Sequence, residues 1–192
     1  MLDKERCGWP GNDSLMIEYH DAEWGVPLRD DRKLFEFLLL DGAQAGLSWQ
    51  TVLRKREGYR RAFDNFDPQK IALYGDAEVE RLMRDAEIIR NRQKIASAIG
   101  NARSYLQVVR EEGSFADFIW SFVEGKPIVN QWNTHEGAPA TSLQSESMSR
   151  ELRRRGFRFV GPTICYAFMQ AAGLVNDHVV TCFRYEEVNS GT

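Results

Sequence analysis

Hydrophobic residues recur along most of this chain at intervals of three and four, the spacing that lines one face of an α-helix. The one alternating stretch, 158–160, is too short and too close to glycine to predict a β-strand. The pattern therefore predicts an all-α fold. The expected helices begin at Asp30 or Asp31, at Ser48 and at Asp67-Pro68, and further ones span 90–112, 115–123, about 142–155 and a stretch that ends at Gly173.

The segment 125–139 lacks a helical period and contains glycine and proline, so we expect a loop there. No repeat, low-complexity segment or linker divides the sequence, and 192 residues is about the length of one domain. We therefore expect residues 1–192 to form a single domain, with lobes that the chain can enter twice.

Composition excludes several classes of protein. A hydrophobic fraction of 43% and a charged fraction of 28% are those of a globular protein. No apolar run is long enough for a membrane span, and the N-terminus has no segment of signal-peptide type, so we expect a cytoplasmic protein. Three widely spaced cysteines argue against a disulfide framework. A net charge of −3 argues mildly against a protein that coats nucleic acid.

Cysteine and histidine residues occur in two pairs near the two ends of the chain. Cys7 and His20 lie near the N-terminus, and His178 and Cys182 are four residues apart near the C-terminus. Thiolates and imidazoles are the ligands that zinc prefers, and four of them make a closed, structural site. The four residues could therefore hold one Zn²⁺ ion that ties the termini together. By spacing alone, the alternative of inert thiols and ordinary polar histidines is favoured.

The remaining cysteine and histidine are not expected to bind a metal. Cys165 lies among apolar residues, so we expect it to pack in the core. His135 lies in the predicted loop, and we assign its side chain to solvent.

A basic stretch precedes a turn bounded by glycines. Residues 150–158 contain five arginines and one acid, and the turn runs from Gly156 to Thr163 before a helix begins. Backbone N–H groups at a helix N-terminus, with arginines beside them, form a natural site for a nucleic-acid phosphate. A solvated helix face followed by an ordinary connection is the alternative.

Aromatic residues gather near one acid. Trp9, Tyr19, Trp24 and Trp49 lie close in sequence to Asp41, which interrupts an apolar helix end. Aromatic faces around a carboxylate would form a pocket for a flat, cationic ligand. Alternatively, the tryptophans fill the core and Asp41 ends a helix in water.

The chain resembles the DNA-3-methyladenine glycosylase I family, a branch of the helix-hairpin-helix DNA glycosylases. The resemblance covers residues 5–182, nearly the whole chain, and it is specific because its motifs occur together in this order. The matching blocks are Arg6-Cys7-Gly8-Trp9, Tyr19-His20-Asp21, Glu23-Trp24-Gly25-Val26-Pro27, Gln44-Ala45-Gly46-Leu47-Ser48-Trp49, Gly156-Phe157-Arg158-Phe159-Val160-Gly161 and Gly173-Leu174-Val175-Asn176-Asp177-His178-Val179.

The resemblance implies a two-lobed helix-hairpin-helix fold with the base pocket between the lobes. It implies a structural zinc joining the N- and C-termini. The resemblance also implies the residues of each site. The zinc ligands are Cys7, His20, His178 and Cys182; the residues that bind the base are Tyr19, Trp49, Trp9 and Met16; the catalytic residue is Asp41; and the residues that contact DNA are Gln44, Gly46, Leu47, Arg158, Gly161 and Thr163.

Two positions depart from the family's pattern. The family's usual acid is a glutamate where this chain has Asp41, whose shorter side chain still accepts hydrogen bonds from a base edge. A neighbouring position that is often tyrosine in relatives is Met16. Both departures bear on the strength and selectivity of base binding.

The implied activity is hydrolysis of the N-glycosidic bond of 3-methyladenine in double-stranded alkylated DNA, by a monomer that flips the nucleotide and releases the free base. The family lacks the aspartate that many relatives carry after the hairpin, so we interpret Asp177 as structural. A non-catalytic DNA-damage-binding protein is the alternative. A zinc hydrolase is disfavoured, because four protein ligands leave no open position on the metal.

Overall fold

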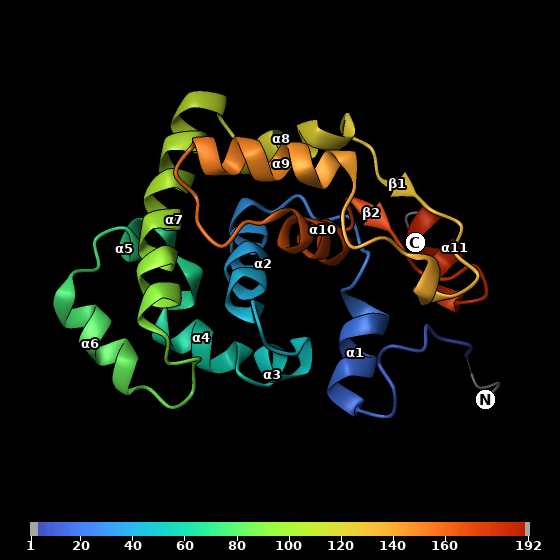
Figure 1. Cartoon of the computed structure of the whole chain (residues 1–192), viewed down its shortest axis with the longest axis horizontal. Coiled ribbons are helices and arrows are strands. Elements are labelled where there is room, and N and C mark those ends of the chain that lie inside the picture. The colour runs from blue at the N-terminus through green and yellow to red at the C-terminus, as the bar shows by residue number, and fades with distance from the viewer. Residues whose placement is uncertain (1–3, 191–192) are drawn as a thin grey trace.

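A computed structural model describes residues 4–190, and it places eleven α-helices within that range (Figure 1). The all-α prediction is confirmed for most of the chain. In residues 4–190, no helix is both long and apolar enough to cross a membrane. The helices are α1 (Ser14–Ala22), α2 (Asp31–Gln44), α3 (Trp49–Arg54), α4 (Arg56–Ala62), α5 (Pro68–Ile71), α6 (Asp76–Arg84), α7 (Arg92–Glu112), α8 (Phe115–Trp120), α9 (Leu143–Arg154), α10 (Pro162–Ala171) and α11 (Phe183–Ser190), with short 3₁₀ turns η1 (Asp64–Phe66), η2 (Ser121–Val123) and η3 (His135–Gly137).

Two short strands are the exception to the all-α prediction. β1 (Ile128–Val129) pairs in parallel with β2 (Val175–Asn176), and Ile128 lies opposite Val175. The expectation of no strand was therefore wrong at these residues. Two residues are too few to show an alternating pattern, and the pairing joins segments far apart in the sequence.

Side-chain caps explain where several of the helices begin. Asp30 is the N-cap of α2, and its carboxylate accepts a hydrogen bond from the backbone N–H of Lys33 at 2.8 Å. Asp31, the alternative candidate, accepts the backbone N–H groups of Phe115 and Ala116 instead. The adjacent aspartates thus cap two different helices, and Asp31 fixes the start of α8 against the start of α2.

Helix α2 forms the centre of the core. Figure 1 shows α2 and α10 in the middle of the molecule, with α7 along one side and α9 across one end. Residues 34–43 of α2 are all buried, because the helix packs against α3, α7, α8 and α10. A helix that is buried on every face carries few polar side chains, so Asp41 in its last turn is an exception that requires a reason.

The two ends of the chain pack against each other. The backbone N–H of Phe183 donates a hydrogen bond to the carbonyl of Glu5 at 2.9 Å. Gly173 has a φ of +68°, and a Cβ atom there would lie 2.3 Å from the backbone carbon of Val26. Only glycine allows this approach, which holds the segment before β2 against the chain that follows α1.

Candidate functional site

A cavity of about 330 Å³ lies where α1, α2, α3, α10 and the loop before α9 meet. The residues that line it come from segments that are far apart in the sequence. They are Trp9, Tyr19, Trp24, Asp41, Gln44, Trp49, His135, Ala138, Pro139, Ala167, Gln170 and Ala171.

Aromatic rings form most of the cavity wall. The ring centroid of Tyr19 lies 5.3 Å from that of Trp49 and 6.2 Å from that of Trp9. Trp9 in turn lies 5.1 Å from Trp24, with the ring planes at 66°. Rings held edge to face in this way support one another and leave other faces for a planar ligand. The arrangement suits a flat heterocycle.

Asp41 contributes a buried carboxyl group to the cavity. Its side chain is 2% exposed, so the alternative of a helix end in water is wrong. Its Oδ2 atom forms no hydrogen bond with any residue in the range 4–190. Burial raises the pKa of Asp41 well above its ordinary value, because removal from water disfavours the charged form. Burial is the main cause that raises the pKa of Tyr19, and the negative charge of Asp41 raises it further.

Four buried polar atoms of the cavity residues lack partners in the described part of the chain. They are Nε1 of Trp9, Nε1 of Trp49, Nε2 of His135 and Oδ2 of Asp41. Buried polar atoms are normally hydrogen-bonded, since leaving one unpaired costs about 1–3 kcal/mol. Their concentration around one cavity indicates that a polar ligand completes the hydrogen bonds there.

We expect Asp41→Asn to raise Tm at about pH 8 but not at about pH 3. At the lower pH, Asp41 is protonated in both the folded and the unfolded chain. As the pH rises from the ordinary carboxyl pKa toward the raised folded pKa, the unfolded chain loses its proton first, so the free energy of unfolding falls. Calorimetry of both proteins across this range measures the difference. A Tm difference that does not change with pH would contradict a raised pKa.

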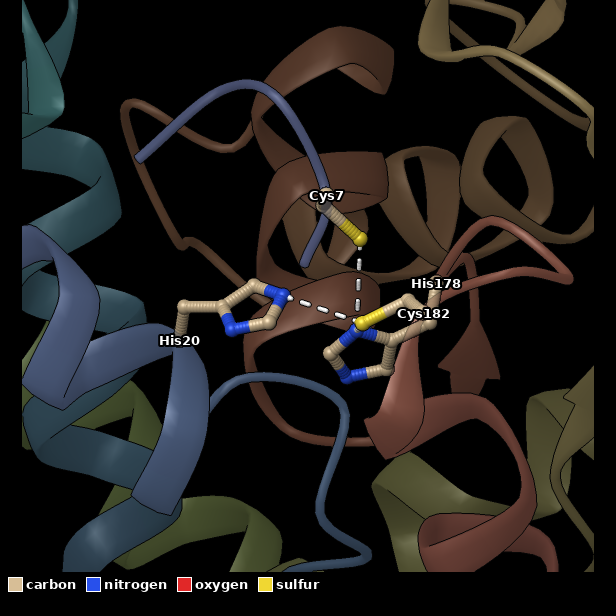
Figure 2. A group of neighbouring side chains, drawn as sticks. All are labelled: Cys7, His20, His178 and Cys182. Atoms are coloured by element: carbon tan, nitrogen blue, oxygen red, sulfur yellow. Dashed lines mark hydrogen bonds between the residues drawn. The ribbon is translucent and has the colours of Figure 1, made fainter. Parts of the chain in front are cut away.

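A second cluster joins the two ends of the chain. Cys7 and His20 come from the N-terminal segment, His178 and Cys182 come from the C-terminal segment, and their side chains converge (Figure 2). All four residues are buried, and one ligand atom from each lies within 4.8 Å of the others. The four residues predicted from the sequence are therefore brought together, and the cluster can hold a metal ion.

Each imidazole in the cluster is oriented by a partner on its other nitrogen. Nδ1 of His20 lies 2.7 Å from Oδ1 of Asp21, which leaves Nε2 facing the cysteines. Nε2 of His178 lies 3.1 Å from the carbonyl oxygen of Trp24, which leaves Nδ1 facing them. This is the usual arrangement of metal-binding histidines, whose second nitrogen donates to an oxygen. Arg6 holds the Asp21 carboxylate in turn, through Nε at 2.9 Å.

The metal cluster and the cavity share two short segments. Trp9 follows Cys7 by two residues, and its ring lies 5.4 Å from that of His20. Tyr19 directly precedes His20 on α1. Any metal that fixes Cys7 and His20 therefore also fixes two aromatic walls of the cavity.

The loop 44–47 projects from the mouth of the cavity. Leu47 is 43% exposed, which is unusual for a leucine, and Gly46 has a φ of +77° that favours glycine. Lys94 donates hydrogen bonds from Nζ to the carbonyl oxygens of Ala43 and Ala45, both at 2.7 Å. Lys94 thus caps the end of α2 and anchors the base of this loop.

The hairpin between α9 and α10 is fixed from behind by α7. Asn101 accepts the backbone N–H of Arg158 at 2.8 Å and donates to the carbonyl of the same residue at 3.0 Å. Gly156 closes α9 with a φ of +91°. Phe159 lies 3.4 Å from where a Cβ of Gly42 would be, so the hairpin contacts the last turn of α2. The hairpin is therefore held between α7 and the end of α2, the helix from which the loop 44–47 continues.

The arginines before the hairpin fall into two groups. Arg154 and Arg155 form ion pairs with Glu151, and Arg155 also reaches Glu111. Arg150 and Arg153 form no ion pair within residues 4–190, and Nη2 of Arg153 lies 3.5 Å from where a Cβ of Gly161 would be. The predicted surplus of positive charge is therefore reduced by ion pairs with acids of α7 and α9, while Arg153 lies free beside the N-terminus of α10.

Some sequence predictions need correction or qualification. The assignment of His135 to solvent was wrong, since its side chain is half-buried and lines the cavity. Met16 is buried in the core and is not among the lining residues, so its contact with a base stays a prediction. Cys165 is fully buried, as expected. Asp177 is buried and accepts hydrogen bonds from four side chains, which is a structural role.

His135 and Gln170 were missed because their sequence neighbourhood carries no signal of a site. His135 lies in an irregular loop that tertiary packing folds over the cavity, and Gln170 lies on an apolar helix. A lone histidine in a polar loop is read from sequence as solvent-exposed, and no spacing rule connects it with Asp41.

Comparison with known proteins gives consistent similarities. A family model described as methyladenine glycosylase matches residues 9–185. DNA-3-methyladenine glycosylase 1 of Escherichia coli (strain K12) is 56% identical over 181 residues, which are 94% of this chain and 97% of that protein. A crystal structure of 3-methyladenine DNA glycosylase I superimposes with a TM-score of 0.92, at 52% identity, over 93% of this chain and 98% of the other. The enzyme of that name from Staphylococcus aureus, whose structure concerns 3-methyladenine recognition, gives a TM-score of 0.91 at 36% identity over 93% and 95%.

Proposed function

The chain belongs to the methyladenine glycosylase family, and we propose that it hydrolyses the N-glycosidic bond of 3-methyladenine in alkylated DNA as a step of base excision repair. The observation that carries the proposal is the aromatic cavity with the buried carboxyl group of Asp41, whose Oδ2 atom has no partner among the described residues. Tyr19, Trp49 and Trp9 supply ring faces and edges for a purine. Asp41 accepts hydrogen bonds from its polar edge.

The nucleotide must leave the helical stack before its base can enter this cavity. The exposed side chain of Leu47, together with Gln44, is suited to fill the gap that the flipped nucleotide leaves. Gly46 allows the tight turn between them, and Lys94 holds the turn in place. The loop 44–47 therefore acts as the wedge.

The chemistry follows from the charge of the lesion. Methylation at N3 makes the base cationic, so the N9–C1′ bond breaks with its electron pair moving to the base, which leaves as a neutral molecule. Water adds to C1′ and loses a proton. Asp41 in its ionised form favours the cationic base, because burial, which raises the pKa of Asp41, disfavours its negative charge until an opposite charge lies beside it. No lysine lines the cavity within residues 4–190, so we propose a monofunctional enzyme without a lyase step.

We propose that the metal is one structural Zn²⁺, held by Cys7, His20, His178 and Cys182. Zinc bonds of about 2.3 Å to sulfur and about 2.0 Å to nitrogen separate these atoms by about 3.5 Å in a tetrahedron. Three sulfur–nitrogen distances in the cluster are 3.5, 3.5 and 3.6 Å. The four residues therefore fit the ion, whose chemistry here is to tie the chain ends together and hold Trp9 and Tyr19.

The hairpin is the proposed contact with the DNA backbone, through Arg158, Gly161 and Thr163. We expect Arg153→Ala to weaken binding to duplex DNA and to reduce the slope of log affinity against log salt by about one, because one phosphate contact is lost. Arg154→Ala is the matched control, since Arg154 lies on the same helix but is paired with Glu151. Fluorescence anisotropy at several salt concentrations measures both slopes. Equal effects of the two variants would contradict the proposed role of Arg153.

We further propose that residues 1–192 work as one glycosylase domain, as a cytoplasmic monomer on double-stranded DNA. The hydrogen bond from the backbone N–H of Phe183 to the carbonyl of Glu5, which joins the N- and C-terminal segments, supports a single domain. Sedimentation of the free chain and of its complex with a short duplex tests the monomer.

The experiment that tests the proposed function is release of free bases from methylated duplex DNA, with 3-methyladenine and 7-methylguanine resolved. We expect release of 3-methyladenine. Binding of the same DNA without any release would favour the second candidate, a non-catalytic DNA-damage-binding protein. The observation that favours this candidate is Asp41, which stands where the family's usual acid is a glutamate.

A further inference from the structure

His135 is placed at the cavity by the loop that precedes α9. It opens the short turn η3, and its ring lies 6.0 Å from that of Trp24 at an angle of 56°. Its Nε2 atom is buried and has no partner among the described residues. Asp41 of α2 lines the same cavity, and its Oδ2 atom also has no partner in residues 4–190. The imidazole is therefore a polar group held at the cavity with its hydrogen bond still to be made.

The loop that carries His135 is held to the segment after β2 by hydrogen bonds. Trp132 donates from Nε1 to Oδ1 of Asp177 at 2.8 Å, and Asn130 donates to the same oxygen at 2.7 Å. The carbonyl of Trp132 also accepts the backbone N–H of Val180 at 2.9 Å. These contacts tie the start of the loop to the segment after β2, so the position of His135 is built into the fold.

The chemistry available to His135 is that of a neutral imidazole. Burial lowers its pKa, so the ring is uncharged near neutral pH. A neutral imidazole offers one N–H donor and one acceptor nitrogen. The purine edge that carries the amino group also carries ring nitrogens that accept hydrogen bonds. Once Asp41 accepts the amino group, a donor is the complement that such a ring nitrogen requires.

We propose that His135 is a specificity-determining residue of the cavity, whose Nε2–H donates a hydrogen bond to a ring nitrogen of the extruded adenine-type base. The inference rests on the proposed function, because it concerns the base that this function binds. It gives Asp41 and His135 complementary tasks, one accepting from the base and one donating to it. A base whose ring nitrogen carries a hydrogen meets two donors face to face and is disfavoured.

The first test measures binding of free 3-methyladenine by titration calorimetry. His135→Phe keeps an aromatic ring beside Trp24 but removes both nitrogens, and we expect it to weaken binding by about fivefold without changing Tm. His135→Gln restores a donor and is expected to recover part of the affinity. Glu136→Gln, an exposed change one residue away, is the control and is expected to bind as the wild type does.

The second test asks whether the lost affinity belongs to one ring nitrogen. Analogues of 3-methyladenine with carbon in place of N1 or of N7 are bound to the wild type and to His135→Phe. We expect the fivefold effect of the variant to vanish for one analogue and to persist for the other. An undiminished effect with both analogues, or no effect on 3-methyladenine itself, overturns the proposal.

The assays separate the inference from the function on which it rests. Release of 3-methyladenine by the wild type establishes the function whatever the His135 variants do. With three histidines in the sequence and two of them in the metal cluster, the His135 ring is also identifiable by nitrogen NMR. We expect its Nε2 signal to shift on addition of 3-methyladenine, and an unshifted signal under saturation contradicts the contact.

Discussion

Replacing Asp41 by alanine is expected to slow release of 3-methyladenine from methylated DNA by about 100-fold. A hydrogen bond to a charged group contributes about 1.5–3 kcal/mol, and each 1.36 kcal/mol changes a rate tenfold. Asp41 is the one carboxyl group in the cavity lining within residues 4–190, so no neighbour can replace it. Single-turnover assays with saturating enzyme measure the rate of the chemical step.

Two further substitutions separate the contribution of the negative charge of Asp41 to the release rate from that of its side-chain length. Asp41→Asn keeps the size but not the charge, so we expect it to release the cationic base nearly as slowly as alanine does. Asp41→Glu carries the family's usual acid, and we expect it to keep release within about tenfold of the wild type. Asp117→Ala, an exposed carboxylate on α8, is the control. Unchanged release by Asp41→Ala would show that the aromatic walls alone select the base.

Loss of the proposed zinc ion is expected to have the second large effect. We expect Cys182→Ser to lower the free energy of unfolding by about 4 kcal/mol, which is about 10 °C in Tm for a chain of this size. The hydrogen bond from Cys7, with those from the two imidazoles, lowers the pKa of Cys182, so the thiolate that a metal requires is favoured. A chelator is expected to produce the same loss in the wild type.

Base affinity should fall together with stability, because Trp9 and Tyr19 are attached to the cluster. Cys165→Ser is the matched control, since it makes the same chemical change at a buried cysteine outside the cluster. Elemental analysis is expected to find one zinc ion per chain in the wild type and in Cys165→Ser, and none in Cys182→Ser. A zinc-free wild type with unchanged Tm would contradict the structural role.

Local sequence patterns were sufficient for most helices because a helix is stabilised by contacts between residues three and four apart. Asp30, Ser48 and Asp67 begin helices by capping backbone groups within three residues of themselves. The spacing of His178 and Cys182 was compatible with one shared metal ion, but by itself it favoured inert residues, and the family resemblance was what implied the metal site. The same local rules could not see β1 and β2, since each is two residues long and gains its partner across the fold.

The sequence also identified the chemistry of the cavity without its geometry. Aromatic residues around Asp41 suggested a pocket for a flat cation. Tryptophans packed in the core and an aspartate at a solvated helix end explained the same residues equally well. The packing of α2 on every face excluded the solvated helix end, because it buries Asp41 and leaves its Oδ2 atom without a partner in residues 4–190.

The sequence by itself therefore determined the helical class and most helix starts. Through joint motifs it also determined the family, and the family implied the four residues of the metal cluster. Only the tertiary structure decided which arginines remain unpaired and that His135 faces the cavity. Ion pairs such as that of Arg155 with Glu111 join residues 44 apart, and the loop with His135 is held by Asp177. Contacts of this kind depend on where whole elements pack, and no periodic pattern along the chain encodes them.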